Sequence, residues 1–342
     1  MSRQFAGITA LASYLPEKRE SNIDLVGEER AKKFGILERP IAAPNETPGD
    51  MAYKAAEKLL NKFVAVSAEN IRFVLLCVET PDYIVPNTAC HIASRLGIPK
   101  NCGAVDYNLG CSGYVYGLAL AKGLIETGLT PNVLLLTCNK SSDYTHPKDM
   151  NLRPLFGDGA TATFIEAVDA PSELLHSFVF GTDGEGFQKL YLPVGGNRHK
   201  PLDTPRVFEN DANGNVRSNY ELHMDGNGIF LFTMRTVPKL VEEILTKASC
   251  NREDVDYYVF HQPNGFMMQE LQKKCRLTER PFYRNIEHIG NTVANSVPLG
   301  LEYVFGEANP QSLKKVMLAG FGIGLSWSGC IADFGFYGDE RR

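Results

Sequence analysis

The stretch NLGCSGYVYG (108–117) places a cysteine among glycine and serine residues, at a point where one sequence pattern gives way to another. The residues before it, CGAVDYN (102–108), have the length and composition of a short strand. After it, apolar residues recur at helical spacing until Gly128, a residue type that commonly follows the end of a helix. The stretch therefore predicts a junction between a strand and a helix, with Cys111 at the start of the helix.

Apolar runs of strand length alternate with helical patterns on both sides of this junction. Their near-continuous hydrophobicity is typical of strands buried on both faces, in a sheet that helices cover. The order of elements recurs in the second half, so we predict an α/β fold of two similar halves, residues 1–172 and 173–342. The predicted strands are 5–15, 71–79, 102–108, 131–139 and 160–168, and then 255–262, 314–324 and 328–336, of which the last three correspond to 71–79, 131–139 and 160–168.

Composition excludes several classes of function. The chain has 342 residues, 44% of them hydrophobic, which suffices for a large core. Its net charge is -5 and it has no run of Lys and Arg, so it lacks the electrostatic footprint of a nucleic-acid binder. No apolar run approaches the roughly 20 residues of a membrane span. We therefore expect neither nucleic acid nor membrane as a partner.

The cysteines and the N-terminus indicate a compartment. Eight cysteines are present, none in a C-x-x-C pair, and several lie within apolar runs, where cysteine is usually a small core residue. The first 20 residues contain a short apolar stretch but no cleavage pattern, so we interpret them as a first strand rather than a signal peptide. These features predict a reduced, cytoplasmic protein.

Cys111 is the first candidate for chemistry. The free N–H groups and the dipole at a helix start favour a thiolate, so its pKa is expected to fall below the ordinary value. The same N–H groups could hold the oxyanion that forms when a thiolate attacks a thioester or ester carbonyl. The alternative is a buried structural cysteine in a tight turn, and the local pattern alone leaves both open.

His261 and Asn291 are two further candidates. His261 lies at the end of the predicted strand 255–262, just before a turn that Pro263 and Gly265 close, so it could point into a cleft as a general base or an oxyanion donor. Asn291 follows a glycine in EHIGNTVANS and could donate a hydrogen bond beside that histidine. The alternatives are an ordinary loop histidine and ordinary turn chemistry.

Glycine-rich turns and one polar segment complete the survey. GFGIGLSW (320–327) lacks the G-x-G-x-x-G spacing of nucleotide loops, and FGDGA (156–160) matches no phosphate loop, so both are interpreted as tight turns that bring backbone N–H groups near a ligand. No set of His, Cys and Asp has metal-ligand spacing, and no metal is expected. The polar segment 183–222 is a lid, a binding loop or an interface insert.

Taken together, these motifs resemble the β-ketoacyl-acyl-carrier-protein synthase III family of condensing enzymes, within the thiolase-like superfamily. The resemblance extends over nearly the whole chain and implies a five-layer αβαβα fold made of two duplicated halves. The motifs that carry it, in the family's order, are ASYLPEKRESNIDL, GILERPIAAPNET, NLGCSG, LFGDGA, MDGNGIF, HQPN, HIGNTVANSVP and GFGIGLSW.

The resemblance implies roles for the candidates. Cys111, His261 and Asn291 would form a catalytic triad, and Cys111 would take an acyl group from acyl-CoA or an acyl carrier protein. A malonyl thioester would then lose CO2, while His261 and Asn291 hydrogen-bond the enolate oxygen. The backbone N–H groups of Cys111 and Ile323 would hold the tetrahedral oxyanion. The resemblance also implies a homodimer and no cofactor beyond these substrates.

The chain departs from the family pattern at several positions. The segment before G-I-x-E-R lacks the tryptophan that stacks on CoA, and Phe266 replaces an arginine that helps to dock the carrier, which leaves Lys273 and Lys274 as candidates for docking. Val85 matches a position, often Phe, that reaches across the dimer into the acyl pocket, so its size suggests room for a longer acyl chain. We therefore expect a specialised rather than a housekeeping member.

Three other functions compete with decarboxylative condensation. The acyl group could pass from Cys111 to a hydroxyl, an amine or another carbon acid, although retention of both His261 and Asn291 favours condensation. The chain could be a non-catalytic partner subunit, but such subunits typically lack the cysteine. A cysteine hydrolase is chemically feasible, but no residue pattern selects it.

Overall fold

Two β-sheets form the frame of the molecule. The structure is a computed structural model that describes residues 3–211 and 214–335. The first sheet has the strand order β1-β7-β6-β4-β5, and the second has the order β13-β14-β15-β8. The strands are β1 (Arg3–Tyr14), β4 (Phe73–Val78), β5 (Gly103–Tyr107), β6 (Asn132–Asn139), β7 (Gly159–Ala170), β8 (Leu175–Thr182), β13 (Tyr257–Phe260), β14 (Val316–Gly322) and β15 (Ser326–Ala332).

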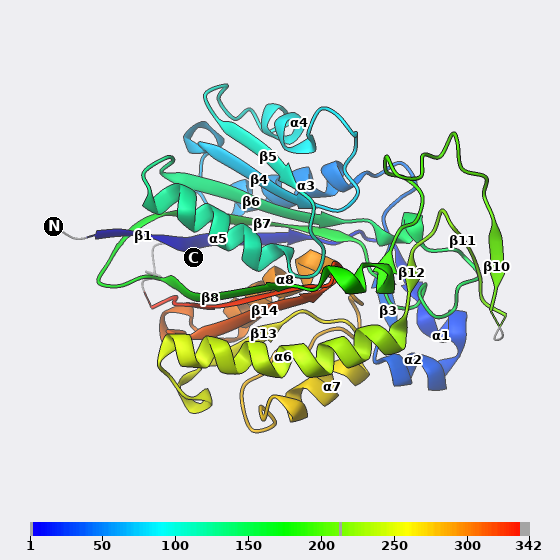
Figure 1. The fold of residues 1–342 in the computed structure, drawn as a ribbon. Coiled ribbons are helices and arrows are strands. Elements are labelled where there is room, and N and C mark those ends of the chain that lie inside the picture. Colours follow the sequence, from blue (N-terminus) through cyan, green and yellow to red (C-terminus); the bar gives the residue numbers. More distant parts are fainter. Residues whose placement is uncertain (1–2, 212–213, 336–342) are drawn as a thin grey trace.

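Helices lie on both faces of each sheet and produce five layers (Figure 1). One pair packs on the outer face of the first sheet, a second pair lies between the sheets, and a third covers the second sheet. The αβαβα arrangement is therefore confirmed. In layer order the helices are α3 (Pro48–Lys62) and α4 (Thr88–Arg95), then α5 (Gly113–Glu126) and α8 (Ser296–Glu307), and finally α6 (Gly226–Ala248) and α7 (Gly265–Lys274).

The two sheets repeat one pairing scheme. In the first sheet β4 pairs with β6 in parallel, and β6–β7 and β7–β1 are antiparallel. In the second, β13 pairs with β14 in parallel, and β14–β15 and β15–β8 are antiparallel. Strands β13, β14 and β15 thus occupy the places of β4, β6 and β7, which are the correspondences predicted from the sequence. The first sheet draws on residues 3–170 and the second on residues 175–332.

The central helix α5 is the one that follows Cys111. It is apolar around most of its circumference, as expected for a helix enclosed by protein, and Tyr114, Leu118 and Ala121 are fully buried. It ends just before Gly128, which adopts a positive φ of 76°. Because both sheets pack against α5, the position of its first residues is fixed from two sides.

One expectation about the strands is wrong. β5 was expected to be buried on both faces, but it lies at the edge of the first sheet and is only partly covered. The side chain of Val105 is 45% exposed. An apolar run alone does not distinguish a central strand from an apolar edge strand, so the sequence could not reveal this.

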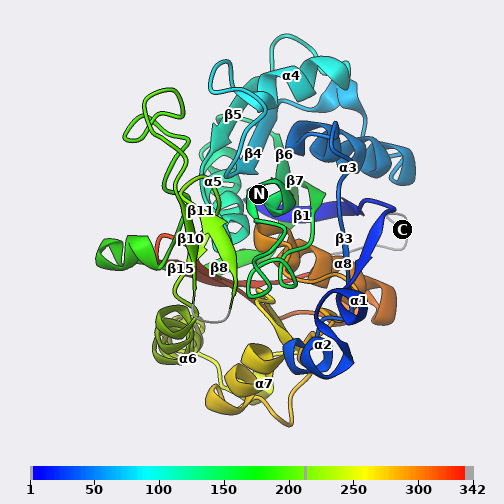
Figure 2. The same cartoon turned by 90° about the vertical axis from the view of Figure 1, so that its right-hand side faces the viewer.

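Shorter elements gather at one end of the molecule, which faces the viewer in Figure 2. Within the described ranges, no helix is both long and apolar enough to cross a membrane. All eight cysteines are free thiols. The shorter elements are β2 (Arg19–Ser21), α1 (Asn22–Val26), α2 (Glu28–Phe34), β3 (Glu38–Pro40), β9 (Leu190–Tyr191), β10 (Phe208–Asn210), β11 (Val216–Ser218) and β12 (His223–Met224).

Candidate active site

Cys111 lies in the turn between β5 and α5 and is buried. The next residue anchors this turn to the second sheet. The Ser112 hydroxyl lies 2.7 Å from that of Ser326, and the Ser328 hydroxyl donates to the Ser112 carbonyl oxygen at 2.8 Å. Strand β15 of the C-terminal half therefore positions the thiol that the N-terminal half contributes.

The glycine turn after β14 closes over the sulfur. A Cβ atom added to Gly322 would lie only 2.8 Å from the Cys111 Sγ, so glycine at this position allows the strand to approach the thiol. The backbone N–H groups of Ile323 and of Cys111 itself face the sulfur and favour its ionised form. These are the two donors expected to form the oxyanion hole.

The pKa of Cys111 contradicts the expectation from the helix start. Burial raises this pKa above its ordinary value, the nearby Glu79 carboxylate raises it further, and the two backbone N–H groups only partly offset these effects. The prediction of a lowered pKa is therefore wrong, because the desolvation of a buried thiol outweighs the helix dipole. The resting site holds a neutral thiol that must lose its proton during attack.

His261 follows the last residue of β13 and is buried. Its backbone N–H donates to the Ala319 carbonyl at 2.7 Å, which holds it against β14. Its ring Nδ1 lies 2.7 Å from the Ser296 hydroxyl. Burial lowers the pKa of the imidazole to about 3, so the ring is neutral at physiological pH. A neutral imidazole that uses Nδ1 for Ser296 presents Nε2 to the cavity.

Asn291 is held by both its backbone and its side chain. Its backbone N–H donates to the Leu155 carbonyl at 2.8 Å, and its carbonyl accepts from the Gly157 N–H at 3.0 Å. The side-chain oxygen accepts from the Val293 N–H at 2.9 Å. Because that oxygen is engaged, the orientation leaves the amide NH2 group of Asn291 as the donor for a ligand.

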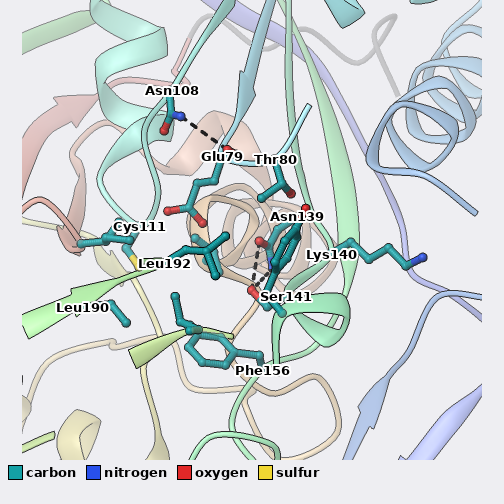
Figure 3. A pocket seen from close by; sticks show the side chains of 14 residues that line it. Glu79, Thr80, Asn108, Cys111, Asn139, Lys140, Ser141, Phe156, Leu190 and Leu192 are labelled. Carbon is teal, nitrogen blue, oxygen red and sulfur yellow. Dashed lines mark hydrogen bonds between the residues drawn. The ribbon is translucent and has the colours of Figure 1, made fainter. Parts of the chain in front are cut away.

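Two cavities meet at Cys111. The narrower cavity, about 100 Å³, is lined by Cys111, His261 and Asn291. The wider cavity, about 200 Å³, is lined by Cys111 and Ile323 together with polar and apolar side chains (Figure 3). The structure thus brings together the four residues for which chemical roles were predicted. The wider cavity is also lined by Glu79, Thr80, Asn108, Asn139, Lys140, Ser141, Tyr144, Phe156, Leu190, Leu192, Leu222 and Val293.

The polar segment 183–222 contributes walls to the site. Leu190, Leu192 and Leu222 line the wider cavity, and Leu190 also lines the narrower one. Of the three functions left open for this segment, a binding loop is the one that these contacts support. These leucines are scattered among polar residues, so the average polarity of the segment does not reveal that they line the site.

Glu79 is a residue of the cavity that the sequence analysis does not single out. It follows the last residue of β4, and its side chain extends into the wider cavity toward Cys111 (Figure 3). Burial raises the pKa of its carboxyl group to about 7. A charged residue directly after a buried parallel strand was the available indication, because ligands bind at the carboxyl ends of such strands.

Comparison with known proteins decides the family. The family model for 3-oxoacyl-[acyl-carrier-protein] synthase III matches residues 105–184, and the model for its C-terminal domain matches residues 245–334. The β-ketoacyl-[acyl-carrier-protein] synthase III of Clostridioides difficile is 34% identical over 332 residues, which cover 95% of this chain and 97% of that protein. The chain belongs to the 3-oxoacyl-[acyl-carrier-protein] synthase III family.

Other synthase III proteins agree in sequence and in fold. The enzyme of Caldanaerobacter subterraneus is 32% identical, over 95% of this chain and 97% of its own length. A crystal structure of a 3-oxoacyl-(acyl-carrier-protein) synthase III superimposes with a TM-score of 0.92 at 44% identity, covering 96% of this chain and 99% of that one. The structure from Thermus thermophilus gives 0.83 at 31% identity, covering 96% and 98%. The resemblance inferred from the motifs is confirmed, and this chain is a condensing enzyme.

Three residues to which the family pattern gives roles lie outside both cavities. Val85 is 80% exposed, in the loop between β4 and α4. Lys273 and Lys274 are exposed at the end of α7, a ten-residue helix about 15 Å long whose other end meets the narrower cavity. Phe266, at that nearer end, is exposed and stacks on Phe230 with ring centroids 5.9 Å apart. Val85, Lys273 and Lys274 therefore line neither cavity at Cys111.

Proposed function

We propose that this synthase III takes an acyl group from a thioester onto Cys111 and joins it to a malonyl thioester with loss of CO2. The observation that carries the proposal is the meeting of Cys111 with a neutral His261 and an oriented Asn291 amide at one narrow cavity. The named relatives are condensing synthases, so transfer of the acyl group to a hydroxyl or an amine is not proposed.

In the first half-reaction the sulfur of Cys111 attacks the carbonyl carbon of the acyl thioester. The carbonyl oxygen becomes negative and accepts hydrogen bonds from the backbone N–H groups of Cys111 and Ile323. One such donor typically contributes about 10²–10³ to the rate. The intermediate then expels the donor thiol and leaves an acyl thioester on Cys111.

In the second half-reaction the malonyl thioester binds with its thioester carbonyl oxygen between His261 and Asn291. Loss of CO2 places negative charge on that oxygen as an enolate, which both side chains stabilise as neutral donors. The α-carbon of the enolate attacks the acyl carbonyl on Cys111, and the same two backbone N–H groups receive the new oxyanion. Collapse releases a β-ketoacyl thioester and the Cys111 thiolate, which takes up a proton from solvent and returns to the neutral thiol.

The donor role of His261 requires a proton on Nε2. Its Nδ1 must then accept a hydrogen bond from the Ser296 hydroxyl, which also lies 2.8 Å from the Val293 carbonyl oxygen. A serine hydroxyl has one proton, so donation to His261 and donation to Val293 are alternatives. The proposed mechanism selects donation to His261 in the catalytic state.

The substrates are proposed to arrive on coenzyme A or on an acyl carrier protein, as the names of the relatives indicate for the carrier. The exposed Lys273 and Lys274 would contact an acidic carrier. A homodimer is proposed in which the exposed apolar run of Tyr83, Ile84 and Val85 meets the second chain. No cofactor is needed, because the two thioesters supply every atom of the reaction.

The test is intact-protein mass spectrometry after exposure to acetyl-, hexanoyl- and octanoyl-thioesters on CoA and on carrier protein. A malonyl-carrier chase follows, and Cys111→Ala is the control. The proposal predicts an acyl adduct that the control lacks and that leaves with release of CO2 during the chase. An adduct that persists through the chase would contradict condensation with malonate. Preference for acetyl over octanoyl donors would contradict the inference of a roomier pocket from Val85.

A further inference from the structure

Glu79 holds a carboxyl group in the site that the mechanism above does not use. It stands one residue after β4, as His261 stands one residue after β13, and these two strands occupy equivalent places in the two sheets. The duplicated fold therefore directs one titratable side chain from each half toward Cys111. His261 reaches the narrower cavity and Glu79 the wider one.

The carboxylate packs against the nucleophile turn itself. A Cβ atom added to Gly110 would lie 2.4 Å from the Glu79 Oε1 and 2.4 Å from the Ile323 side chain. Gly110 is the residue directly before Cys111, so glycine there makes room for the acid. The Glu79 carboxyl group therefore borders Gly110 and the turn that carries the second oxyanion donor. It lines the same cavity as Cys111 and extends toward that residue (Figure 3).

Nothing described around Glu79 neutralises it. No described residue donates a hydrogen bond to its carboxylate or forms an ion pair with it. Lys140 lines the same cavity, but its ammonium group points away and pairs with Asp143 at 3.0 Å (Figure 3). The other titratable side chains that surround Glu79 are Cys77, Cys111 and Tyr144.

The first half-reaction needs an acid–base group at this place. The Cys111 thiol is neutral at rest and must lose a proton, whereas the departing donor thiolate must gain one. His261 is poorly suited, because burial lowers its pKa to about 3 and makes it a weak base. A carboxyl group with a pKa of about 7 can both accept and return a proton near neutral pH.

We propose that Glu79 is the general acid–base that carries the Cys111 proton to the leaving thiol during acylation. As the sulfur–carbon bond to the acyl group forms, the thiol proton moves to the Glu79 carboxylate. As the carbon–sulfur bond of the donor breaks, its sulfur takes that proton and departs as a thiol. Glu79 returns to its ionised form, and no net proton is gained or lost.

The order of events also avoids two adjacent anions. An ionised Glu79 beside the oxyanion of the tetrahedral intermediate would be unfavourable, because like charges repel and burial already disfavours the charged form of this carboxyl group. Because Glu79 receives the proton as the oxyanion forms, the negative charge moves from the carboxylate to the carbonyl oxygen. The cavity carries one negative charge throughout the step. This inference rests on acylation of Cys111, the first half of the proposed function.

The test compares Glu79→Gln with the wild-type enzyme in single-turnover acylation, followed by rapid-quench mass spectrometry. The donors are the CoA thioester that labels wild-type Cys111 and the thiophenyl ester of the same acyl group, whose thiolate leaves without a proton. We expect acylation by the CoA thioester to slow by about a hundredfold or more. The slowing should be smaller for the thiophenyl ester. Glu69→Gln, an exposed acid that lines neither cavity, is the matched control.

The pH profile supplies a readout that a purely structural role would not change. Wild-type acylation should rise with pH through an ionisation near 7, and this ionisation should vanish in Glu79→Gln. Alkylation of Cys111 by iodoacetamide measures the same proton loss without any acyl donor and should slow in parallel. Equal rates in wild type and Glu79→Gln, or an equal slowing with both donors and an unchanged profile, would overturn the proposal. A wild-type acyl adduct that resists the malonyl chase would instead contradict the proposed condensation and leave this result standing.

Discussion

The two cavities that meet at Cys111 differ in whether their polar side chains have hydrogen-bond partners. On the narrow side, His261 and Asn291 are buried, and each is held by a defined partner: Ser296 for the imidazole and the Val293 N–H for the amide oxygen. On the wide side, the Glu79 carboxylate has no described partner, and burial raises its pKa. The difference shows that one side is preorganised as a pair of fixed donors, whereas the other keeps a group free to change its protonation state.

Removal of Cys111, which lines both cavities, should produce the largest difference between the two half-reactions. Cys111→Ala removes the nucleophile, so acylation should fall by at least about 10⁴-fold. Slow decarboxylation of a malonyl thioester should persist, because the donors on the narrow side remain intact. Released CO2 and protein mass, measured on one sample, check both statements. Complete loss of decarboxylation with a normal fold would show that the narrow side cannot act without the thiol.

Loss of either narrow-side donor should affect only the second half-reaction. His261→Ala and Asn291→Ala should each slow malonyl decarboxylation by about 10²–10³-fold, the usual effect of one donor to a developing oxyanion. Acylation of Cys111 should remain within about tenfold of wild type in both. Asn45→Ala, an exposed asparagine outside both cavities, controls for the substitution. Equal slowing of both half-reactions would remove the distinction between the two sides.

The partner of His261 should have a smaller effect on the same step. Ser296→Ala removes the hydroxyl that contacts Nδ1, so the ring loses its fixed orientation and proton placement. Decarboxylation should slow by roughly tenfold to a hundredfold, the effect seen when the partner that orients a metal-ligating histidine is removed. Acylation should be unchanged. Ser296→Thr, which keeps a hydroxyl, should recover much of the rate, and failure to do so would suggest a packing role.

The smallest expected effect concerns stability and distinguishes the free acid from the held donors. An unfolded glutamate has a pKa of about 4.3, whereas burial raises that of Glu79 to about 7. As pH rises between these values, the unfolded state loses its proton first, so this carboxyl lowers the stability of the fold increasingly up to about pH 7 and by a constant amount above it. The two pKa values set an upper limit of about 4 kcal/mol for this effect at pH 8. Because the side chain is only partly buried and solvent screens it, Glu79→Gln should increase the free energy of unfolding at about pH 8 by ~2 kcal/mol. Urea denaturation at acidic and alkaline pH checks this, and a gain that is equal at both would contradict it.

Much of the architecture follows from local patterns in the sequence. The apolar runs, the junction at Cys111 and the correspondence between the strands of the two halves are all found where they were predicted. Local patterns could not predict how burial and the helix dipole combine to set the pKa of a side chain. The helix start favours a thiolate, yet enclosure between two sheets raises the pKa of Cys111 because desolvation dominates.

The candidate site shows the same limit. His261 and Asn291 belong to short sequence motifs that can each be recognised separately. The chemical role of Glu79, by contrast, can be inferred only from residues that are distant in sequence and surround it in the fold. Its position beside Gly110 and Ile323 depends on the pairing of two sheets and the close approach of the turn after β14. The sequence shows only that a glutamate follows an apolar run, which is compatible with many environments. The folded structure shows which environment surrounds Glu79.

The most direct test of the account is a malonyl chase of acylated Asn291→Ala, followed by intact mass and CO2 release. If the two sides of Cys111 perform separate steps, the acyl adduct forms at nearly the wild-type rate and then persists, with little CO2 released. Disappearance of the adduct at the wild-type rate, with matching CO2, would show that Asn291 does not serve decarboxylation. Failure of the adduct to form in a correctly folded variant would show that the two half-reactions cannot be assigned to separate sides of the site.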